Sequence, residues 1–116
     1  MPLTGNVWNL IDTARGNPAE EVIDPIARGS SFEMKRIVSF GHRAPETGWF
    51  DQPEAEWVLL VAGSAGLRFE DEETDRYLQA GDAIYIAPHR RHRVSWTESG
   101  ASTIWLALHF EPVASP

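Results

Sequence analysis

Glu56 and His92 are the two side chains of this sequence whose types and positions point most directly to chemistry. Glu56 stands before an apolar run that ends at Gly63, and His92 follows Gly81 by eleven positions and opens another run. A carboxylate and an imidazole at the edges of short strands can hold a metal ion or polarise a bound ligand. We therefore expect these two residues to face one end of a small β-barrel.

Short runs rich in Val, Ile, Phe, Trp and Tyr dominate the chain after residue 30, and Gly, Pro or acidic clusters separate them. Such runs predict strands. We expect strands over Phe32–Phe40, Trp49–Gln52, Glu56–Ala62, Leu67–Glu70, Arg76–Leu78, Ala83–Ile86, His92–Thr97 and Ser102–Phe110. Their regular spacing predicts an all-β fold, an antiparallel sandwich or barrel.

The turns between these runs predict which strands pair. The segment Gly63–Gly66 predicts a hairpin that joins Glu56–Ala62 to Leu67–Glu70. The segment Glu98–Ala101 predicts that the last two strands also pair with each other. In the first strand, alternation places an apolar set on one face, namely Phe32, Met34, Val38 and Phe40, and Glu33, Lys35 and Ser39 on the other.

The first thirty residues give weaker signals. Val7–Ile11 is predicted to be an edge strand, Asn17–Glu20 one helical turn that Asn17 caps, and Val22–Ile26 a further strand. We accordingly divide the chain into an N-terminal edge segment (1–30) that packs on the barrel or on a partner, the barrel itself (31–111) and a flexible tail (112–116).

The strand Glu56–Ala62 is apolar on both faces. Val58 and Leu60 share a face with Glu56, whereas Trp57, Leu59 and Val61 make the opposite face apolar as well. A strand of this kind is covered on both sides. The cover is either the N-terminal segment or a second subunit, and we predict a homodimer.

Composition limits the classes of function that the chain can serve. Its 116 residues suit one domain, and 10 Lys and Arg against 17 Asp and Glu give a net charge of −7. Binders of nucleic acids or anionic membranes need a basic face, so neither is expected as a partner. The absence of Cys excludes disulfides and thiolate metal sites. With no signal peptide and no apolar run long enough to span a membrane, we predict a soluble, cytoplasmic protein.

The segment from Glu56 to Trp96 resembles the paired motifs of the cupin superfamily. Those motifs read G-x5-H-x-H-x3-4-E-x6-G and G-x5-P-x-G-x2-H-x3-N. Glu56 and Gly63 match the second half of the first motif, and Gly81 and His92 match the spacing of the second. The strings W-F-D-Q-P-E-A-E-W-V and W-L-A-L-H-F are similar to those of small single-domain bacterial cupins. The resemblance implies a jelly-roll barrel (a double-stranded β-helix) whose open end holds a metal ion and a substrate.

The resemblance also implies a divalent metal ion, such as Fe, Mn, Zn or Ni, with Glu56 and His92 as ligands. The two histidines of the first motif are absent, and their slots fall either on Trp49 and Asp51 or on Phe50 and Gln52. We predict Asp51 as the third ligand, since two carboxylates and an imidazole suit hard divalent ions. Gln52 is its rival, as a weaker neutral ligand or a substrate-binding residue. The alternatives are a turn-forming Asp51, a Glu56 paired with an arginine, and an ordinary half-buried His92.

Five further residues are assigned to the substrate. His109 is the candidate catalytic acid or base, because an imidazole titrates near neutral pH; its alternative is a hydrogen bond to a backbone carbonyl. His89 and Arg90, in the loop before His92, are predicted to bind substrate, and Arg90 with Arg91 is expected to attract an anionic group. These arginines could instead be neutralised by the acidic stretch 70–75. Trp96 and Trp105 are predicted to wall the pocket or to be core.

Two classes of function remain open from the sequence. The first is a metal-dependent cupin that acts on a small polar, anionic metabolite as an oxygenase, isomerase, decarboxylase or lyase. The second is a non-enzymatic cupin that binds or senses a small ligand with a degraded metal site, which the missing histidine pair favours. A structural dimer module without a ligand is the third possibility.

Overall fold

The computed structural model describes residues 5–113, which form eight strands and no α-helix. The strands are β1 (Val22–Arg28), β2 (Phe32–Ser39), β3 (Ala55–Ala62), β4 (Ser64–Phe69), β5 (Arg76–Gln79), β6 (Ala83–Ile86), β7 (His92–Thr97) and β8 (Thr103–Phe110). Within these residues no helix is long and apolar enough to cross a membrane. Residues 1–4 at the start, and 114–116 of the expected flexible tail, lie outside the described part.

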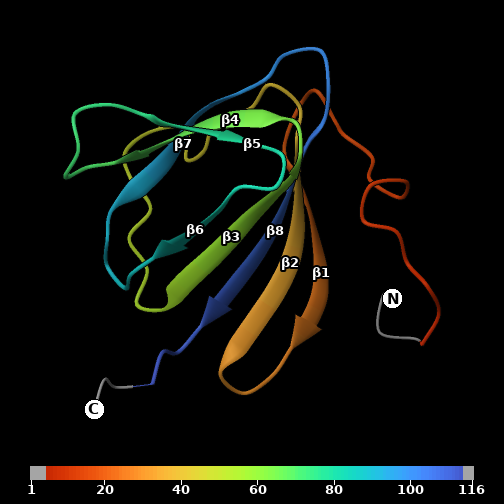
Figure 1. Ribbon diagram of the computed structural model, residues 1–116, viewed down its shortest axis with the longest axis horizontal. Coiled ribbons are helices and arrows are strands. Elements are labelled where there is room, and N and C mark those ends of the chain that lie inside the picture. Colours follow the sequence, from red (N-terminus) through yellow and green to blue (C-terminus); the bar gives the residue numbers. More distant parts are fainter. Residues whose placement is uncertain (1–4, 114–116) are drawn as a thin grey trace.

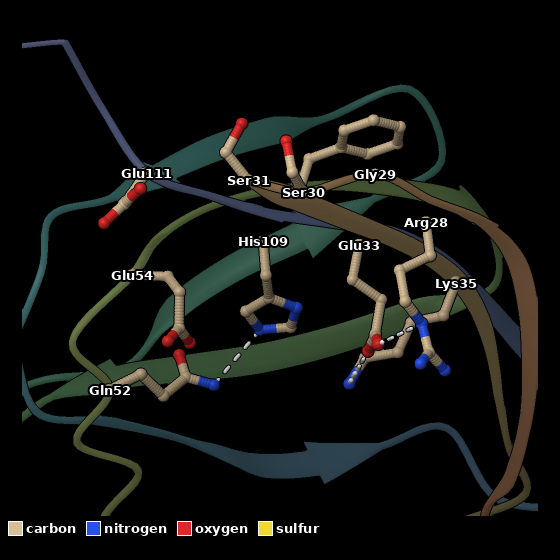
Figure 2. Close-up of a pocket in the computed structure, with 11 residues that line it drawn as sticks. Arg28, Gly29, Ser30, Ser31, Glu33, Lys35, Gln52, Glu54, His109 and Glu111 are labelled. Carbon is tan, nitrogen blue, oxygen red and sulfur yellow. Dashed lines mark hydrogen bonds and ion pairs between the residues drawn. The ribbon is translucent and has the colours of Figure 1, made fainter.

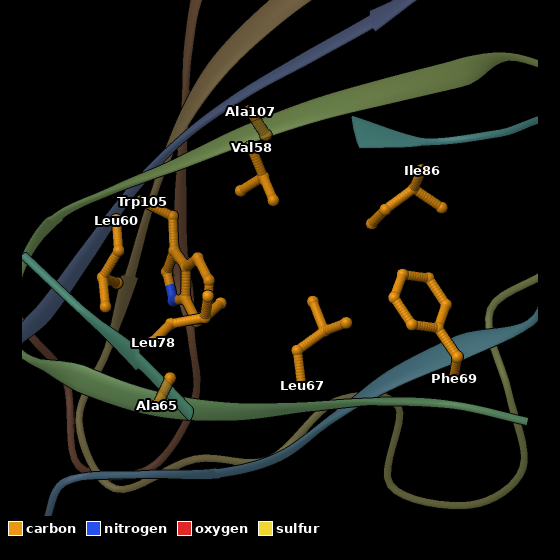
Figure 3. Close-up of a cluster of buried hydrophobic side chains, with 9 residues drawn as sticks. All are labelled: Val58, Leu60, Ala65, Leu67, Phe69, Leu78, Ile86, Trp105 and Ala107. Atoms are coloured by element: carbon orange, nitrogen blue, oxygen red, sulfur yellow. The ribbon is translucent and has the colours of Figure 1, made fainter. Parts of the chain in front are cut away.

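Two antiparallel sheets face each other and enclose the core (Figure 1). The larger sheet has the order β1-β2-β8-β3-β6, and the smaller one has the order β5-β4-β7. Their facing side chains form one apolar cluster, shown in Figure 3, of Val58, Leu60, Ala65, Leu67, Phe69, Leu78, Ile86, Trp105 and Ala107. The prediction of an all-β antiparallel barrel is confirmed, and seven of the eight predicted strands coincide with observed ones to within three residues at each end.

The predicted hairpin between β3 and β4 is wrong. β3 pairs with β6 and β8, while β4 pairs with β5 and β7, so the two strands belong to different sheets. The chain changes sheet at Gly63, whose φ is +92° and whose missing side chain leaves room for Thr103 of β8. What looked like a four-residue turn is a corner of the barrel, and β4 begins directly after it.

The predicted pairing of the last two strands is wrong for the same reason. β7 pairs with β4 in the smaller sheet, and β8 lies between β2 and β3 in the larger one (Figure 1). The loop after Thr97 therefore connects the two layers instead of closing a hairpin. This crossing places His92 of β7 opposite the strands that carry Glu56 and His109.

The interior face of β2 is its polar face. Glu33, Lys35 and Ile37 pair with His109, Ala107 and Trp105 of β8, all of which point into the barrel. The apolar face of β2 points outward. Glu33 and Lys35 are the charged side chains on this inner face, and both line the mouth of the barrel described below.

The N-terminal segment packs across the outer face of the larger sheet through Arg36. This buried guanidinium donates to Asp24 Oδ2 at 2.7 Å and to the Thr13 hydroxyl at 2.7 Å, and it lies 4.5 Å from the ring of Trp8. A buried charge must be paired in this way. β1 belongs to the larger sheet as its edge strand, so the sheet begins before the boundary expected at residue 30.

The two elements predicted before β1 are wrong. Val7–Ile11 forms no strand; the Asn9 side chain accepts from the backbone N–H groups of Ile11 and Asp12 in a turn. Asn17–Glu20 forms a tight turn instead of a helix, in which the Asn17 side chain accepts from Ala19 N–H. Asn side chains satisfy such local donors in turns as well as in helix caps, and the sequence does not separate the two.

Candidate functional site

Glu56, His92 and His109 come together at one end of the barrel. Glu56 on β3 and His109 on β8 are direct cross-strand partners, and His92 reaches them from β7 in the opposite sheet. Glu56 Oε1 lies 3.3 Å from His92 Nε2, and Glu56 Oε2 lies 3.5 Å from His109 Nε2. All three side chains are nearly inaccessible to solvent.

The ring of His92 is fixed by its other nitrogen. Nδ1 lies 2.8 Å from the backbone oxygen of Arg90, and because a carbonyl only accepts, Nδ1 carries the hydrogen. Phe50 and Phe69 flank the ring, with centroids 5.6 and 6.3 Å away. The ring is therefore held with Nε2 directed at Glu56.

Gln52 completes the polar end of the site. Its Nε2 lies 3.1 Å from His109 Nε2, so the amide and Glu56 both approach the same ring nitrogen. Phe50 lines the same cavity, two positions earlier. The inward-facing pair of the first cupin-like motif is thus Phe50 and Gln52, with the three-residue gap to Glu56.

Glu56 is ionised over the physiological pH range. Burial raises the pKa of its carboxyl, but the hydrogen bonds and charges of His109 and His92 outweigh this effect and lower the pKa to about 2. The carboxylate therefore presents negative charge to both imidazoles.

A cation is required between Glu56 and His92. With the hydrogen on Nδ1, a neutral His92 ring directs a lone pair from Nε2 at a carboxylate oxygen 3.3 Å away. Two lone pairs at this distance repel. Either a second ring proton or a metal ion removes the repulsion.

The donor types fit a divalent metal ion, although the arrangement does not yet enclose one. Two imidazole nitrogens and one carboxylate are the set that holds Zn²⁺ and non-haem iron in proteins. Within residues 5–113, no three His, Cys, Asp or Glu side chains surround a common point in metal-binding geometry. The Nε2 atoms of His92 and His109 contact Glu56 instead, and His109 Nε2 also contacts the Gln52 amide, so metal binding would replace all three contacts.

An inner cavity of about 150 Å³ lies next to this cluster inside the barrel. Its walls are mainly apolar and include Ile23, Ile37, Val58, Leu67, Ile86, Val94 and Trp105. Glu56, His92, His109 and Gln52 form its polar end. Trp105, predicted either to wall the pocket or to be core, lines this cavity and also belongs to the core cluster, and its indole N–H donates to the Ser39 hydroxyl at 3.3 Å.

A mouth cavity of about 520 Å³ lies outside the inner one (Figure 2). It is formed by the β1–β2 hairpin, the end of β8 and the loop before β3, and it is lined by Arg28, Gly29, Ser30, Ser31, Phe32, Glu33, Lys35, Gln52, Glu54, His109 and Glu111. Lys35, Gln52 and His109 line both cavities. These three residues mark the border that a ligand crosses on the way to Glu56.

The predicted metal ligand Asp51 lies on the surface, away from Glu56 and His92. Its carboxylate pairs with His89 Nδ1 at 2.7 Å, and both side chains are about half exposed or more. His89, predicted to bind substrate, therefore contacts Asp51 and lines neither of the two cavities. Both predictions are corrected because alternation in the extended segment 49–52 turns Gln52 inward and its neighbour Asp51 outward.

Arg90 and Arg91 also lie outside the site. Arg90 donates to both carboxylate oxygens of Asp71, at 3.1 and 3.0 Å, and its guanidinium lies 3.5 Å from the centroid of the Phe69 ring. Arg91 donates to Glu70 at 2.8 Å. The acidic stretch 70–75 neutralises these arginines, so the prediction that Arg90 binds substrate is wrong.

Trp96 faces away from the cavity, contrary to prediction. The partners of Leu67 and Gly66 on β7 are Val94 and Trp96, so Ser95 is an extra residue in a bulge. A bulge reverses the alternation of the residues that follow it. The Trp96 ring consequently stacks on Tyr77 on the outer surface, with centroids 5.9 Å apart.

Lys35 and Glu54 are site residues that sequence reasoning missed, whereas His42, the remaining histidine of the chain, lines neither cavity. Lys35 was placed on the polar face of β2, but nothing in the sequence indicated that this face is internal. His42 accepts from Phe40 N–H at 2.9 Å and lies 3.2 Å from the backbone oxygen of Pro18, so it fastens the N-terminal segment.

Several bacterial proteins of known structure share this fold. A protein from Ralstonia eutropha, described as a candidate mannose-6-phosphate isomerase, is 34% identical, with a TM-score of 0.86 over 92% of this chain and 99% of that one. An RmlC-like cupin from Desulfovibrio desulfuricans has a TM-score of 0.75 at 11% identity, over 93% of this chain and 98% of that one. A cupin superfamily protein from Desulfitobacterium hafniense has a TM-score of 0.68 at 15% identity, over 97% and 90%. Comparison with protein-family models and with curated sequences gives no match. The fold, the motif spacing and these similarities together show that the chain belongs to the cupin superfamily.

Proposed function

We propose that this cupin binds a divalent metal ion through Glu56, His92 and His109 and acts on a small polar metabolite. The observation that carries the proposal is the orientation of His92. Its Nδ1–H is held by the Arg90 carbonyl, and its Nε2 faces the Glu56 carboxylate at 3.3 Å, an arrangement that needs a cation. A hydrogen bond from the second ring nitrogen to a carbonyl is also how metal-binding histidines are usually oriented.

The ion would act as a Lewis acid that polarises an oxygen of the substrate. The chain supplies the other parts of the reaction. His109 borders both cavities, so as a ligand it would place the ion where a substrate enters, and Gln52 borders both cavities beside it and is placed to contact the substrate. The apolar walls of the inner cavity exclude water from this contact. Isomerisation, the reaction class in the description of the Ralstonia eutropha protein, is one that such an ion would serve.

Metal analysis of protein purified without an affinity tag tests the proposal. We expect close to one divalent ion per chain, and a marked loss in the variants Glu56→Gln, His92→Ala and His109→Ala. His89→Ala is the matched control, because His89 is exposed and pairs with Asp51. Less than about 0.1 ion per chain, without thermal stabilisation by added Mn²⁺, Fe²⁺, Ni²⁺ or Zn²⁺, would contradict the proposal.

A second candidate function is ligand binding without catalysis or metal. It is favoured by the contacts of Glu56, whose carboxylate both imidazoles already approach in a buried cluster. In this case a second proton on His92 supplies the required cation. Nitrogen NMR of the His92 ring distinguishes the two functions: a doubly protonated ring near neutral pH, with no metal uptake, supports the binding protein.

A further inference from the structure

We infer that the ligand of this site is an amino-acid-like zwitterion with an apolar side chain. The inference rests on the proposed function, since it names the class of metabolite that the same site accepts. Three features of the two cavities carry it: an apolar inner chamber, a cationic side of the mouth and an anionic side opposite.

The inner cavity suits a small apolar group. Its volume is about 150 Å³, and most of its walls are aliphatic or aromatic. A dry apolar cavity of this size accommodates a group as large as a benzene ring. A wholly polar sugar would lose hydrogen bonds to water there without regaining them from the walls. The part of the ligand that enters the barrel is therefore apolar.

The mouth carries opposite charges on its two sides. Figure 2 shows Arg28 and Lys35 on one side, Glu54 and Glu111 on the other, and His109 between them. Glu33 accompanies the two cations, at 3.5 Å from Arg28 and 3.9 Å from Lys35. Both distances exceed those of a strong charge-assisted hydrogen bond, so a ligand carboxylate can take the place of Glu33 at Lys35.

Glu54 and Glu111 leave one side of the mouth negatively charged. Within residues 5–113, neither carboxylate forms an ion pair or a side-chain hydrogen bond. Carboxylates outnumber cations in the lining by three to two, counting Glu33, Glu54 and Glu111 against Arg28 and Lys35. A ligand that bears only negative charge would meet net repulsion, whereas an ammonium group placed toward Glu54 and Glu111 balances it.

A single ligand placed at the border between the two cavities can reach the apolar chamber and both charged sides of the mouth. Lys35, Gln52 and His109 line both the apolar chamber and the mouth. A ligand with its side chain in the chamber has its head group at this border, where a carboxylate faces Lys35 and an ammonium group faces the opposite carboxylates. An α-carbon carries these three substituents together, and Glu56 and His109 lie beside it.

Isothermal titration calorimetry with a series of truncated probes tests the inference. L-leucine has all three features, 4-methylpentanoate lacks the amine, isopentylamine lacks the carboxylate, and glycine lacks the side chain. We expect leucine to bind about fivefold more tightly than each of the first two truncations, because each exposed charge contributes modestly. Glycine should bind at least roughly tenfold more weakly, because it buries no apolar group.

Matched variants assign each difference to its residues. Glu54→Gln/Glu111→Gln should abolish the higher affinity for leucine than for 4-methylpentanoate, and it should preserve the higher affinity for leucine than for isopentylamine. Lys35→Gln should abolish the second difference in affinity and preserve the first. Glu20→Gln/Glu73→Gln makes the same change of charge at exposed positions outside both cavities, and it should preserve both differences. Equal affinities across the series, no measurable binding of leucine, or selectivity that survives the Glu54/Glu111 variant would each overturn the inference.

The two proposals fail separately. Metal content reports on Glu56, His92 and His109, whereas charge selectivity reports on Lys35, Glu54 and Glu111. A metal-containing protein with no preference for leucine would overturn the ligand class alone. A metal-free protein that selects leucine through Glu54 and Glu111 would overturn the metal proposal alone and support the binding function.

Discussion

Glu56 is the residue on which the site depends, because both imidazoles are oriented against its carboxylate. It is buried in an apolar barrel, which disfavours an ion, yet two histidines from two different strands compensate for the loss of water. Removing one partner of such a buried cluster leaves the other charge unpaired. The consequences of changing Glu56 should therefore appear in stability as well as in function.

In protein freed of metal by a chelator, Glu56→Gln should lower the free energy of unfolding in a pH-dependent way. The carboxyl pKa is lowered from 4.5 to about 2 by His109 and His92 against the effect of burial. Because the carboxyl pKa is lower in the folded state than in the unfolded state, Glu56 stabilises the fold fully at pH values above 4.5. This stabilisation is lost as the pH falls toward 2. The contribution is on the order of 3 kcal/mol, since each unit is worth about 1.4 kcal/mol.

Urea unfolding of parent and variant between about pH 6 and pH 2 measures this contribution. The difference between the two proteins should shrink as pH falls below 4.5, because other carboxylates titrate equally in both. A difference that does not change with pH would show that Glu56 is not paired with the histidines as described.

Arg90 should prove structural. Its hydrogen bonds lower the pKa of the Asp71 carboxyl, with burial opposing and the charges of Arg90 and Arg76 adding to the effect. In Arg90→Ala the pKa of Asp71 should rise toward the ordinary 3.8, as measured by carbon NMR, and ligand affinity should not change. Arg15→Ala, an exposed arginine whose hydrogen bonds go to nearby backbone oxygens, is the control. A loss of ligand affinity in the Arg90 variant would return this residue to the site.

At the scale of elements, the sheet-to-sheet corner at Gly63 decides which residues face one another. A side chain at this position would meet the backbone of Thr103 within 3 Å, and the φ of +92° is itself unfavourable for other residues. Gly63→Ala should therefore destabilise the protein by about 2 kcal/mol or more, as measured by urea unfolding. Gly48→Ala separates the two causes, since Gly48 has a φ of +77° but open space around it, and it should cost only about 1 kcal/mol. Equal costs would mean that the contact with Thr103 is unimportant.

The strands were predictable from the sequence, but their pairing was not. Alternation and turn residues located β6 and β7 at their observed bounds, because these signals are local. A corner such as Gly63 has the same residue types as a hairpin turn, so β3 and β4 were paired wrongly. The choice between Asp51 and Gln52 depended on one residue of register, and the bulge at Ser95 reversed Trp96. Glu56, His92 and His109 were singled out by the sequence, and each lies on a regular strand, but their mutual contact became visible only in the structure.

At the scale of the whole molecule, the alternation of side chains that turns the site residues inward also turns a row of apolar side chains outward. Met34, Leu108, Trp57 and Tyr85 are consecutive cross-strand partners on β2, β8, β3 and β6. Their neighbours in sequence, among them Glu56 and His109, face the cavity. Trp57 is 37% exposed and Tyr85 is 50% exposed, whereas the N-terminal segment covers Arg36 of the same sheet face. One half of this face is thus covered by the chain itself and the other half is not.

We predict that a second copy of the chain covers this row, and light scattering coupled to chromatography should give twice the 13.0 kDa mass of one chain. Trp57→Asp/Leu108→Asp should yield a monomer, because two charges would face each other across a two-fold axis in an apolar interface. Tyr77→Asp is the control, since Tyr77 is 62% exposed but belongs to the smaller sheet. Ala55 and Trp57 flank Glu56 on β3 and face outward, toward the second copy. The dimer would therefore stabilise the strand that carries the central carboxylate. The monomeric variant should then also bind metal more weakly. A parent that is monomeric at about 50 µM would contradict the prediction, since a stable dimer is associated at that concentration.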